Sequence, residues 1–234
     1  TATMLAEWQV ANGRPVQAVV DTDTWLAIDA SPAKPGYTMF RGPNTSANVV
    51  LSFDDCPRSY SAFKSAVLEA EKLNVALVLF PTGACRKAKR FSSTYARTHG
   101  HYVFNHSVNH PNLVKLSYSK AYAELGSPGV VTTFGRPPYG SINATVAKAY
   151  AARSMQPWMW TYDTEDWTKL SQSTVVSRAV TNATPGSTIL MHMQHAAFNR
   201  TAIRAIVSGL AERGLKACAN YPGKTPSKPT AFRC

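Results

Sequence analysis

Two histidines, His106 and His110, stand four positions apart in the stretch FNHSVNHPNL. Histidines at this spacing meet on one face of a helix, or of a helical turn after a strand, and their neutral imidazole nitrogens can bind one divalent ion. Two ligands are too few for a metal site, so a third, hard ligand is needed. The stretch FDDCP offers two adjacent carboxylates, Asp54 and Asp55. The sequence therefore predicts a metal site made of two imidazoles and one carboxylate.

Such a set of ligands leaves coordination positions open, which is typical of a catalytic metal site rather than a structural one. A metal in this setting lowers the pKa of bound water toward about 7 and polarises a carbonyl group. Side chains of neighbouring residues diverge at a strand end, so one carboxylate can bind the metal while the other stays free as a base. The leaving group still needs a proton donor, and His192 in LMHMQH stands in a suitable place. These residues predict metal-assisted hydrolysis.

The elements that must position these residues begin near residue 48, where short apolar runs start to alternate with helical patterns. Regular alternation of this kind is typical of a parallel sheet, closed into a barrel or left open. We expect strands at residues 48–55, 75–83, 101–106, 130–140, 156–163, 187–193 and 215–220, and helices at 61–74, 142–153, 172–183 and 198–213.

Polar residues gather at or just beyond the carboxyl ends of the expected strands, where parallel α/β folds build their sites. They are Asp54, Asp55, His106, Arg136, Asp163, Asp166 and His192. Unrelated turn and cap residues would not collect acidic, basic and imidazole groups at one rim, so we expect one site. Within this set, we expect Asp163 to be a turn or strand-end residue rather than a catalytic one. Of the other histidines, we expect His99 and His101 to be structural and His195 to be exposed, with a substrate contact as the alternative for His195.

Five short motifs follow one another across roughly residues 48–217. They are SFDD at 52–55, HSVNHP at 106–111, RPPYG at 136–140, Asp166-Trp167 and Leu190-x-His192. In order and content they resemble the five motifs of the polysaccharide deacetylases, carbohydrate esterase family 4, which carry the NodB homology domain. The resemblance implies an α/β fold, a distorted (β/α) barrel with about seven parallel strands. It also implies hydrolytic removal of acetyl groups from polysaccharide.

The resemblance gives the metal and the base to particular residues. Asp55, His106 and His110 would bind one divalent ion, with zinc as our first choice and cobalt, nickel or manganese as alternatives. Asp54 would be the general base that activates water, paired with Arg136. An aspartate beside a cation and an arginine stays deprotonated near neutral pH, so the chemistry of the residues agrees with this role.

The resemblance also supplies the acid and the substrate contacts. His192 would be the general acid, oriented by Asp166, because a histidine beside a carboxylate has a raised pKa and can hold a proton. The backbone N–H of Tyr139 would help to stabilise the oxyanion. Further substrate contacts are expected from Trp167, Leu190 and Pro138.

Four cysteines fit two disulfides in an oxidising compartment. We interpret them as Cys56 with Cys85, and Cys218 with Cys234. The second pair brackets a proline-rich tail, and closing that loop would contribute about 3 kcal/mol. Reduced cysteines or a metal site are the alternatives, although no C-x-x-C pair is present. Cys56 follows Asp55 where the family usually has glycine, and redox control of the metal is the alternative to a plain structural tie.

The charge of the chain indicates an anionic partner. Its 25 lysines and arginines against 13 acidic residues give a formal charge of +12 and a pI near 9.7. Basic residues are scattered and no nucleic-acid-binding signature accompanies them, so we expect a bacterial cell wall rather than nucleic acid. No run approaches the roughly 20 apolar residues of a membrane span. The polar start TATMLAEWQ lacks signal-peptide features, and we expect a secreted or wall-associated monomer whose export signal has been removed.

Four segments are expected along the chain. Residues 1–30 resemble the closing third of a peptidoglycan-binding module, on the stretch WQVANGRPVQAVVDTDTWLAI, although the glycine expected after its Val-Asp is missing. Residues 31–47 form a linker with three prolines before residue 44. The deacetylase domain spans 48–217, and the tail at 218–234 is tethered by its disulfide.

The leading functional hypothesis is N-deacetylation of peptidoglycan N-acetylglucosamine. Chitin oligomers and acetylated xylan are alternatives within the same chemistry, because amides and esters pass through the same tetrahedral oxyanion. A hypothesis of another class is a catalytically inactive wall-binding protein. A third treats Asp54 with Asp163 or Asp166 as the carboxylate pair of a glycosidase, but it leaves the two spaced histidines unexplained.

Overall fold

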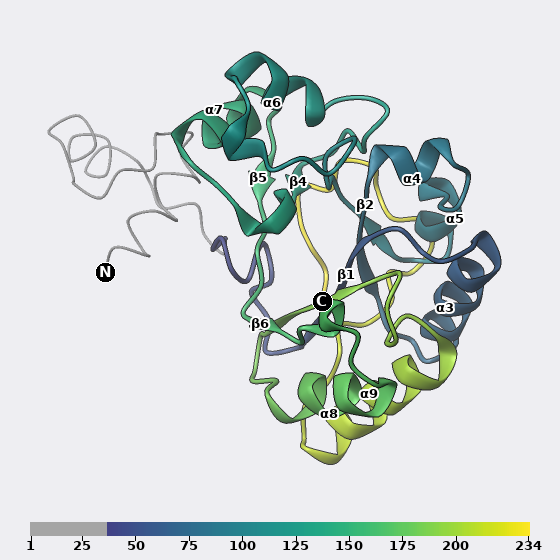
Figure 1. Ribbon diagram of the computed structural model, residues 1–234. Helices are drawn as coiled ribbons and strands as arrows, with labels where there is room; N and C mark the ends of the chain where they lie inside the picture. The colour runs from purple at the N-terminus through teal and green to yellow at the C-terminus, as the bar shows by residue number, and fades with distance from the viewer. Residues whose placement is uncertain (1–36) are drawn as a thin grey trace, which may run out of the picture.

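The structure is a computed structural model that describes residues 37–234 (Figure 1). The module fragment expected at residues 1–30 lies outside the described residues, as does the start of the linker at 31–36. Among residues 37–234, no helix combines the length and the apolar character that a bilayer span requires.

Short parallel strands form the centre of the fold. Five of them share one sheet in the order β3-β2-β1-β7-β6, and β4 pairs with β5 in a second sheet. Their bounds are β1 Val50–Asp55, β2 Leu77–Pro81, β3 Tyr102–Val103, β4 Phe134–Gly135, β5 Gln156–Pro157, β6 Tyr162–Asp163 and β7 Thr188–His192. A parallel bridge from Asn105 to Gly135 connects the two sheets beyond β3. The expected α/β fold with about seven parallel strands is confirmed.

Residues 156–163, expected as one strand, are divided between the two sheets. β5 pairs with β4, whereas β6 pairs with β7. Between them, the Thr161 N–H donates to the Thr188 carbonyl at 2.9 Å. This one extended stretch therefore passes from one sheet to the other without a crossover helix. The strands follow the order of the expected barrel but form two sheets, and one change of sheet falls where this stretch changes its partner.

Seven α-helices of the described residues surround the strands (Figure 1). Their bounds are α3 Tyr60–Lys72, α4 Gly83–Lys87, α5 Ser93–Thr98, α6 Tyr118–Glu124, α7 Ala144–Ala152, α8 Gln172–Thr181 and α9 Arg200–Glu212. We expected α3, α7, α8 and α9 within a few residues of these bounds. The sequence analysis missed α4, α5 and α6, since helices of five to seven residues carry too little periodicity to be recognised.

Helix α3 shows why the long helices form where they do. The Ser59 hydroxyl accepts a hydrogen bond from the Ala62 N–H at 3.1 Å, which satisfies one free donor of the first turn. Phe63 and Val67, one turn apart, are fully buried against the sheet. Burying side chains of this size contributes about 1.5–3 kcal/mol each, so the apolar stripe fixes the helix on the strands.

The tail at 218–234 closes the end of the barrel where the strands begin. The disulfide expected between Cys218 and Cys234 is present. The Phe232 ring packs against Trp158, with ring centroids 5.2 Å apart. The strand expected at 215–220 consists instead of two isolated bridges, one of which joins Val49 to Ala217. The tail therefore adds apolar contacts to the core as well as a covalent tie.

His101 has the structural role that its position before β3 suggested. The side chain is fully buried. One ring nitrogen, Nδ1, accepts from the Leu77 N–H at 3.1 Å, and Nε2 lies 2.9 Å from the Val67 carbonyl. Burial lowers the pKa of His101 from 6.5 to about 4. The neutral ring is the form that fits both hydrogen bonds.

Acidification should therefore destabilise the fold through His101. A pKa lowered in the folded state gives stability that is present above about pH 6.5 and is lost as the pH falls toward 4. The loss from this residue should reach roughly 3 kcal/mol, because one pKa unit corresponds to about 1.4 kcal/mol. Urea unfolding of the wild type and of His101→Gln at pH 7 and pH 4.5 measures it. An equal fall in both proteins would contradict the assignment to His101.

Candidate active site

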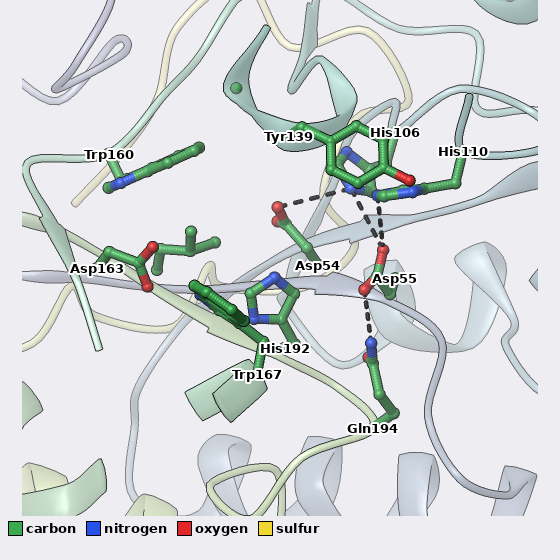
Figure 2. A pocket seen from close by; sticks show the side chains of 12 residues that line it. Asp54, Asp55, His106, His110, Tyr139, Trp160, Asp163, Trp167, His192 and Gln194 are labelled. Carbon is green, nitrogen blue, oxygen red and sulfur yellow. Dashed lines mark hydrogen bonds and ion pairs between the residues drawn. The ribbon is translucent and has the colours of Figure 1, made fainter. Parts of the chain in front are cut away.

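The carboxyl ends of β1 and β7, with the loops after β3 and β4, open onto one cavity of about 440 Å³ (Figure 2). The strand register explains part of this meeting, because Asp54 on β1 pairs with His192 on β7. The residues that line the cavity include Asp54, Asp55, His106, His110, Tyr139 and His192. Six of the residues singled out from the sequence thus face one space.

Asp55, His106 and His110 form a group whose donor atoms could hold one metal ion. The Asp55 Oδ1 lies 3.4 Å from the His106 Nε2 and 3.2 Å from the His110 Nε2. All three ligand atoms lie within 4.8 Å of one another. Ligands bound tetrahedrally at about 2.0–2.1 Å are separated by roughly 3.3 Å, so the two carboxylate–imidazole distances suit zinc. Two imidazoles and one carboxylate also leave room for a fourth ligand.

The two histidines come together in an irregular loop, and the expectation of a helical turn is wrong. Ser107 and His110 have left-handed backbone angles, with φ of 61° and 60°. The Asn105 side chain accepts from the Ser107 N–H at 2.8 Å, and the Ser107 hydroxyl accepts from the His110 N–H at 2.9 Å. These local bonds replace the helical ladder and turn the chain back on itself. The rings of His106 and His110 have centroids 4.8 Å apart.

The electrostatics of the group favour a cation. Burial alone would raise the pKa of Asp55, but the hydrogen bond and charge of His106 hold it well below its usual range. Burial alone would lower the pKa of His106, but the charges of Asp54 and Asp55 raise it above its ordinary value. The Arg136 carbonyl lies 2.7 Å from the His106 Nδ1, which directs Nε2 toward the carboxylates. A positive charge beside Asp55, whether a proton or a metal ion, is therefore stabilised.

Asp54 is paired with a fully buried arginine behind the cavity wall. The Arg136 Nη1 donates to the Asp54 Oδ1 at 2.7 Å. The other Asp54 oxygen, Oδ2, lies 3.7 Å from the His106 Nε2. Three further donors of Arg136 are held by the carbonyls of Trp158 and Met159 and by the Ser52 hydroxyl. Arg136 therefore fixes Asp54 in one orientation, with Oδ2 toward the cavity.

His192 is held by Asp166, which is 1% exposed. The Asp166 Oδ1 lies 2.7 Å from the His192 Nδ1, and Oδ2 accepts from the His192 backbone N–H at 2.8 Å. Burial alone would lower the pKa of His192, but the hydrogen bond with Asp166 and the nearby carboxylates raise it to about 9. With Nδ1 bound to Asp166, the proton on Nε2 is the one available to the cavity.

Three of the four remaining expected residues form the walls and the mouth of the cavity. Tyr139 and Trp167 are 66% and 55% exposed, which is unusual for large aromatic side chains, and both line the opening. Leu190 forms an apolar part of the wall, whereas Pro138 is buried and is not among the lining residues. Tyr139 has a left-handed φ of 61°. Its N–H donates none of the turn and loop hydrogen bonds between backbone groups of residues 37–234.

Two further side chains, Trp160 and Gln194, line the cavity without having been assigned to it from the sequence, and Asp163 lines it as one of the polar residues expected at the strand ends (Figure 2). Asp163 is the turn or strand-end residue that was expected, because it ends β6 and its Oδ1 accepts from the Glu165 N–H at 2.7 Å. Trp160 lies between β5 and β6, and the sequence pattern placed it inside the strand expected at 156–163. Gln194 had no comparable signal.

The disulfide between Cys56 and Cys85 joins the two halves of the group that could bind a metal. Cys56 directly follows Asp55, and Cys85 lies in α4. The first residues of α4 in turn hold the histidine loop, since the Gly83 N–H donates to the Ser107 carbonyl at 3.0 Å. The pairing is the one interpreted from the sequence, and it serves as a tie between the end of β1 and the histidine loop.

Comparison with known proteins gives the family. Residues 41–158, half of the chain, match the family model described as polysaccharide deacetylase. The chain therefore belongs to the polysaccharide deacetylase family, and the resemblance seen in its five motifs is confirmed. The matched range contains Asp54, Asp55, His106, His110 and Arg136.

Two relatives are named as peptidoglycan-N-acetylglucosamine deacetylases. The chain is 32% identical over 164 residues to the peptidoglycan-N-acetylglucosamine deacetylase of Bacillus cereus, a match that covers 65% of this chain and 58% of the relative. It is 30% identical over 159 residues to the peptidoglycan-N-acetylglucosamine deacetylase PgdA of Listeria monocytogenes, covering 64% of this chain and 33% of the relative. The chain thus spans only part of the length of both.

Solved structures share the fold. The peptidoglycan deacetylase PdaC from Bacillus subtilis superimposes with a TM-score of 0.64 at 26% identity, covering 74% of this chain and 88% of that chain. A family 4 pseudoenzyme from Bacillus anthracis superimposes with a TM-score of 0.65 at 22% identity, covering 79% and 67%. Because a pseudoenzyme has this fold too, the fold alone does not establish that this chain is catalytically active. The case for catalytic activity depends on the site residues.

Proposed function

We propose that this protein is a metal-dependent hydrolase that removes acetyl groups from polysaccharide, with the N-acetylglucosamine of peptidoglycan as its substrate. The observation that carries the proposal is the arrangement of the cavity. A group with the donor set of a catalytic metal site lines the same cavity as Asp54 and as His192, which is paired with Asp166. A base, an acid and a cation site facing one space are the parts that acetyl hydrolysis needs.

Asp55, His106 and His110 are proposed as the metal ligands, with zinc as the first choice and cobalt, nickel or manganese as alternatives. When bound, the ion supplies Lewis acidity that polarises the acetyl carbonyl and acidifies water. Burial of His106, the bond from its Nδ1 to the Arg136 carbonyl and the fixed turn at His110 orient the imidazoles before any ion arrives.

The side chains beside the ligands move the protons. The Asp54 Oδ2, which faces the cavity, takes a proton from the attacking water, while Arg136 keeps Oδ1 occupied. The oxygen of that water forms a bond to the acetyl carbon, and the carbonyl oxygen, on which negative charge develops, accepts a hydrogen bond from the Tyr139 N–H. The His192 Nε2 then gives its proton to the amide nitrogen as the C–N bond breaks. Acetate and a free amine leave.

The mouth of the cavity and the charge of the chain support a wall polysaccharide. The exposed rings of Tyr139 and Trp167 flank the opening, where sugar rings can stack on them. The formal charge of +12 favours binding to an anionic polymer at low salt. Together with the names of the relatives, these features favour peptidoglycan over chitin oligomers and acetylated xylan. They also favour a secreted or wall-associated location, and we propose that the protein acts there as a monomer.

Acetate release measured side by side on peptidoglycan, chitooligosaccharides and acetylxylan tests the substrate. We expect release from all of the amide substrates and the highest rate on peptidoglycan. Equal or higher rates on chitooligosaccharides or xylan would overturn the choice of polymer. Absence of acetate from every substrate, with peptidoglycan still bound, would favour the wall-binding protein that lacks turnover.

Metal removal should abolish acetate release. After chelation we expect a loss of at least 100-fold, because the base and the acid alone cannot polarise the carbonyl. Addition of zinc, cobalt, nickel or manganese should restore it, and their order measures the preference of the site. Activity that survives complete removal of metal, checked by elemental analysis, would overturn the metal dependence.

A further inference from the structure

Gln194 binds one of the two oxygens of the Asp55 carboxylate, which is proposed above as a metal ligand. It lies in the turn after β7, and its Nε2 donates to the Asp55 Oδ2 at 2.6 Å (Figure 2). The other oxygen, Oδ1, is the one that faces His106 and His110, at 3.4 and 3.2 Å. One oxygen of Asp55 is thus directed to the imidazoles and the other to an amide.

The side-chain amide of Gln194 forms its hydrogen bond with Asp55. Within residues 37–234 its Oε1 has no hydrogen-bond partner, so the bond to Asp55 is the one hydrogen bond of this side chain. The backbone of the turn is held separately. The Arg58 Nε donates to the Gln194 carbonyl at 2.8 Å, and the Met193 N–H donates to the Asp54 carbonyl at 2.9 Å. Removing the amide therefore leaves the ties that fix the turn.

A carboxylate without such a donor has two binding modes, and they differ in how many coordination positions of the metal they occupy. It can bind an ion through one oxygen or through both, and the second mode uses an additional coordination position. Catalytic sites with three protein ligands depend on a position that remains open. The backbone of Asp55, with its left-handed φ of 71°, fixes where the side chain starts but not how its carboxylate group is rotated. A donor on Oδ2 supplies that missing restraint.

We propose that Gln194 is a positioning residue that keeps the Oδ2 of Asp55 out of the metal site, so that Oδ1 is its single ligand oxygen. The proposal rests on the function proposed above, because it assumes that Asp55 binds the ion. Gln194 does not touch the reacting atoms. Its effect on the reaction passes through the geometry of Asp55 and the number of positions left open.

Cobalt(II) provides a readout that does not depend on turnover, since its visible absorption weakens as the coordination number rises. The test compares the cobalt-loaded wild type with Gln194→Met, which keeps the length of the side chain but cannot donate. We expect a weaker visible band in the variant, because Asp55 takes two positions, and a fall in acetate release of about 10- to 100-fold. An unchanged cobalt spectrum would overturn the proposal, whatever happens to activity.

Two further variants keep the result interpretable. Gln172→Met makes the same chemical change in α8, where the amide oxygen accepts from the Asn199 Nδ2 at 2.8 Å outside the cavity, and it should leave spectrum and activity as in the wild type. Gln194→Leu replaces the methionine variant if that protein fails to fold, with the same expected spectrum. Failure of the proposed function would show differently, as a wild type that binds cobalt but releases no acetate.

Discussion

Replacing Asp54 with asparagine should lower the rate of acetate release by about 10²- to 10⁴-fold, the range typical of losing a general base. Asparagine has nearly the same shape, but its side chain cannot take a proton from water. Its amide oxygen can still accept from the Arg136 Nη1, which lies 2.7 Å from the Asp54 Oδ1, so Arg136 keeps a partner. We therefore expect the variant to fold and to keep its metal.

The measurement is kcat on the preferred substrate together with the metal content of each preparation. Asp163→Asn is the matched control, because it makes the same change in a side chain of the same cavity that serves a turn. Its loss should stay below about tenfold, since turn residues contribute to positioning only. Full activity in Asp54→Asn would remove Asp54 from the mechanism. Equal, large losses in both variants, with new reducing ends in the wild type, would support the glycosidase alternative instead.

Replacing His192 with glutamine should cost a similar factor, about 10²- to 10⁴-fold, because the amine then leaves without its proton. The pH dependence gives the sharper test. A raised pKa means that His192 holds its proton below that value and loses it above, so activity should fall on the alkaline side. In the metal-free protein that pKa is about 9. A cation bound beside Asp55 shifts it downward by repulsion.

Asp166→Asn isolates the cause of this alkaline limit. Asp166 is the hydrogen-bond partner that raises the pKa of His192, and an asparagine there carries no negative charge. The alkaline fall in kcat should move to lower pH by more than one unit, while activity at pH 6 should decline much less than at pH 8. An alkaline limit that stays in place would show that another group sets it. Asp163→Asn again provides the control for charge in the cavity.

The positions of the site residues in the fold could be predicted, because they depend on strand ends. Asp54 and His192 end two strands that happen to be neighbours, and parallel strands bring their carboxyl ends to one edge. The family resemblance added the pairing of His192 with Asp166. The spacing of His106 and His110 correctly predicted that their rings meet, but the predicted cause was wrong. Left-handed backbone angles and side-chain hydrogen bonds of a loop, rather than helical geometry, bring the two rings together.

Other features were beyond a reading of local pattern. Residues 156–163 form two short strands because each half pairs with a different neighbouring strand. The sequence of the stretch does not indicate which strands lie beside it. Gln194 meets Asp55 across two strands and 139 positions, so neither periodicity nor a nearby motif marks it. Short helices such as α4 escaped because one and a half turns hold too few apolar residues to show a stripe.

The tail that carries Cys234 has a consequence for attaching the protein to a surface. Its sulfur lies near the Asn48 carbonyl, just before β1 begins, whereas Asp54 and Asp55 stand where β1 ends. Six residues of strand at about 3.3 Å each separate the two places by roughly 20 Å. A linker joined after Cys234 would leave from the side away from the cavity. A protein anchored through that linker would present its aromatic opening on the side away from the anchor. That orientation suits an insoluble polymer, which cannot diffuse to the enzyme.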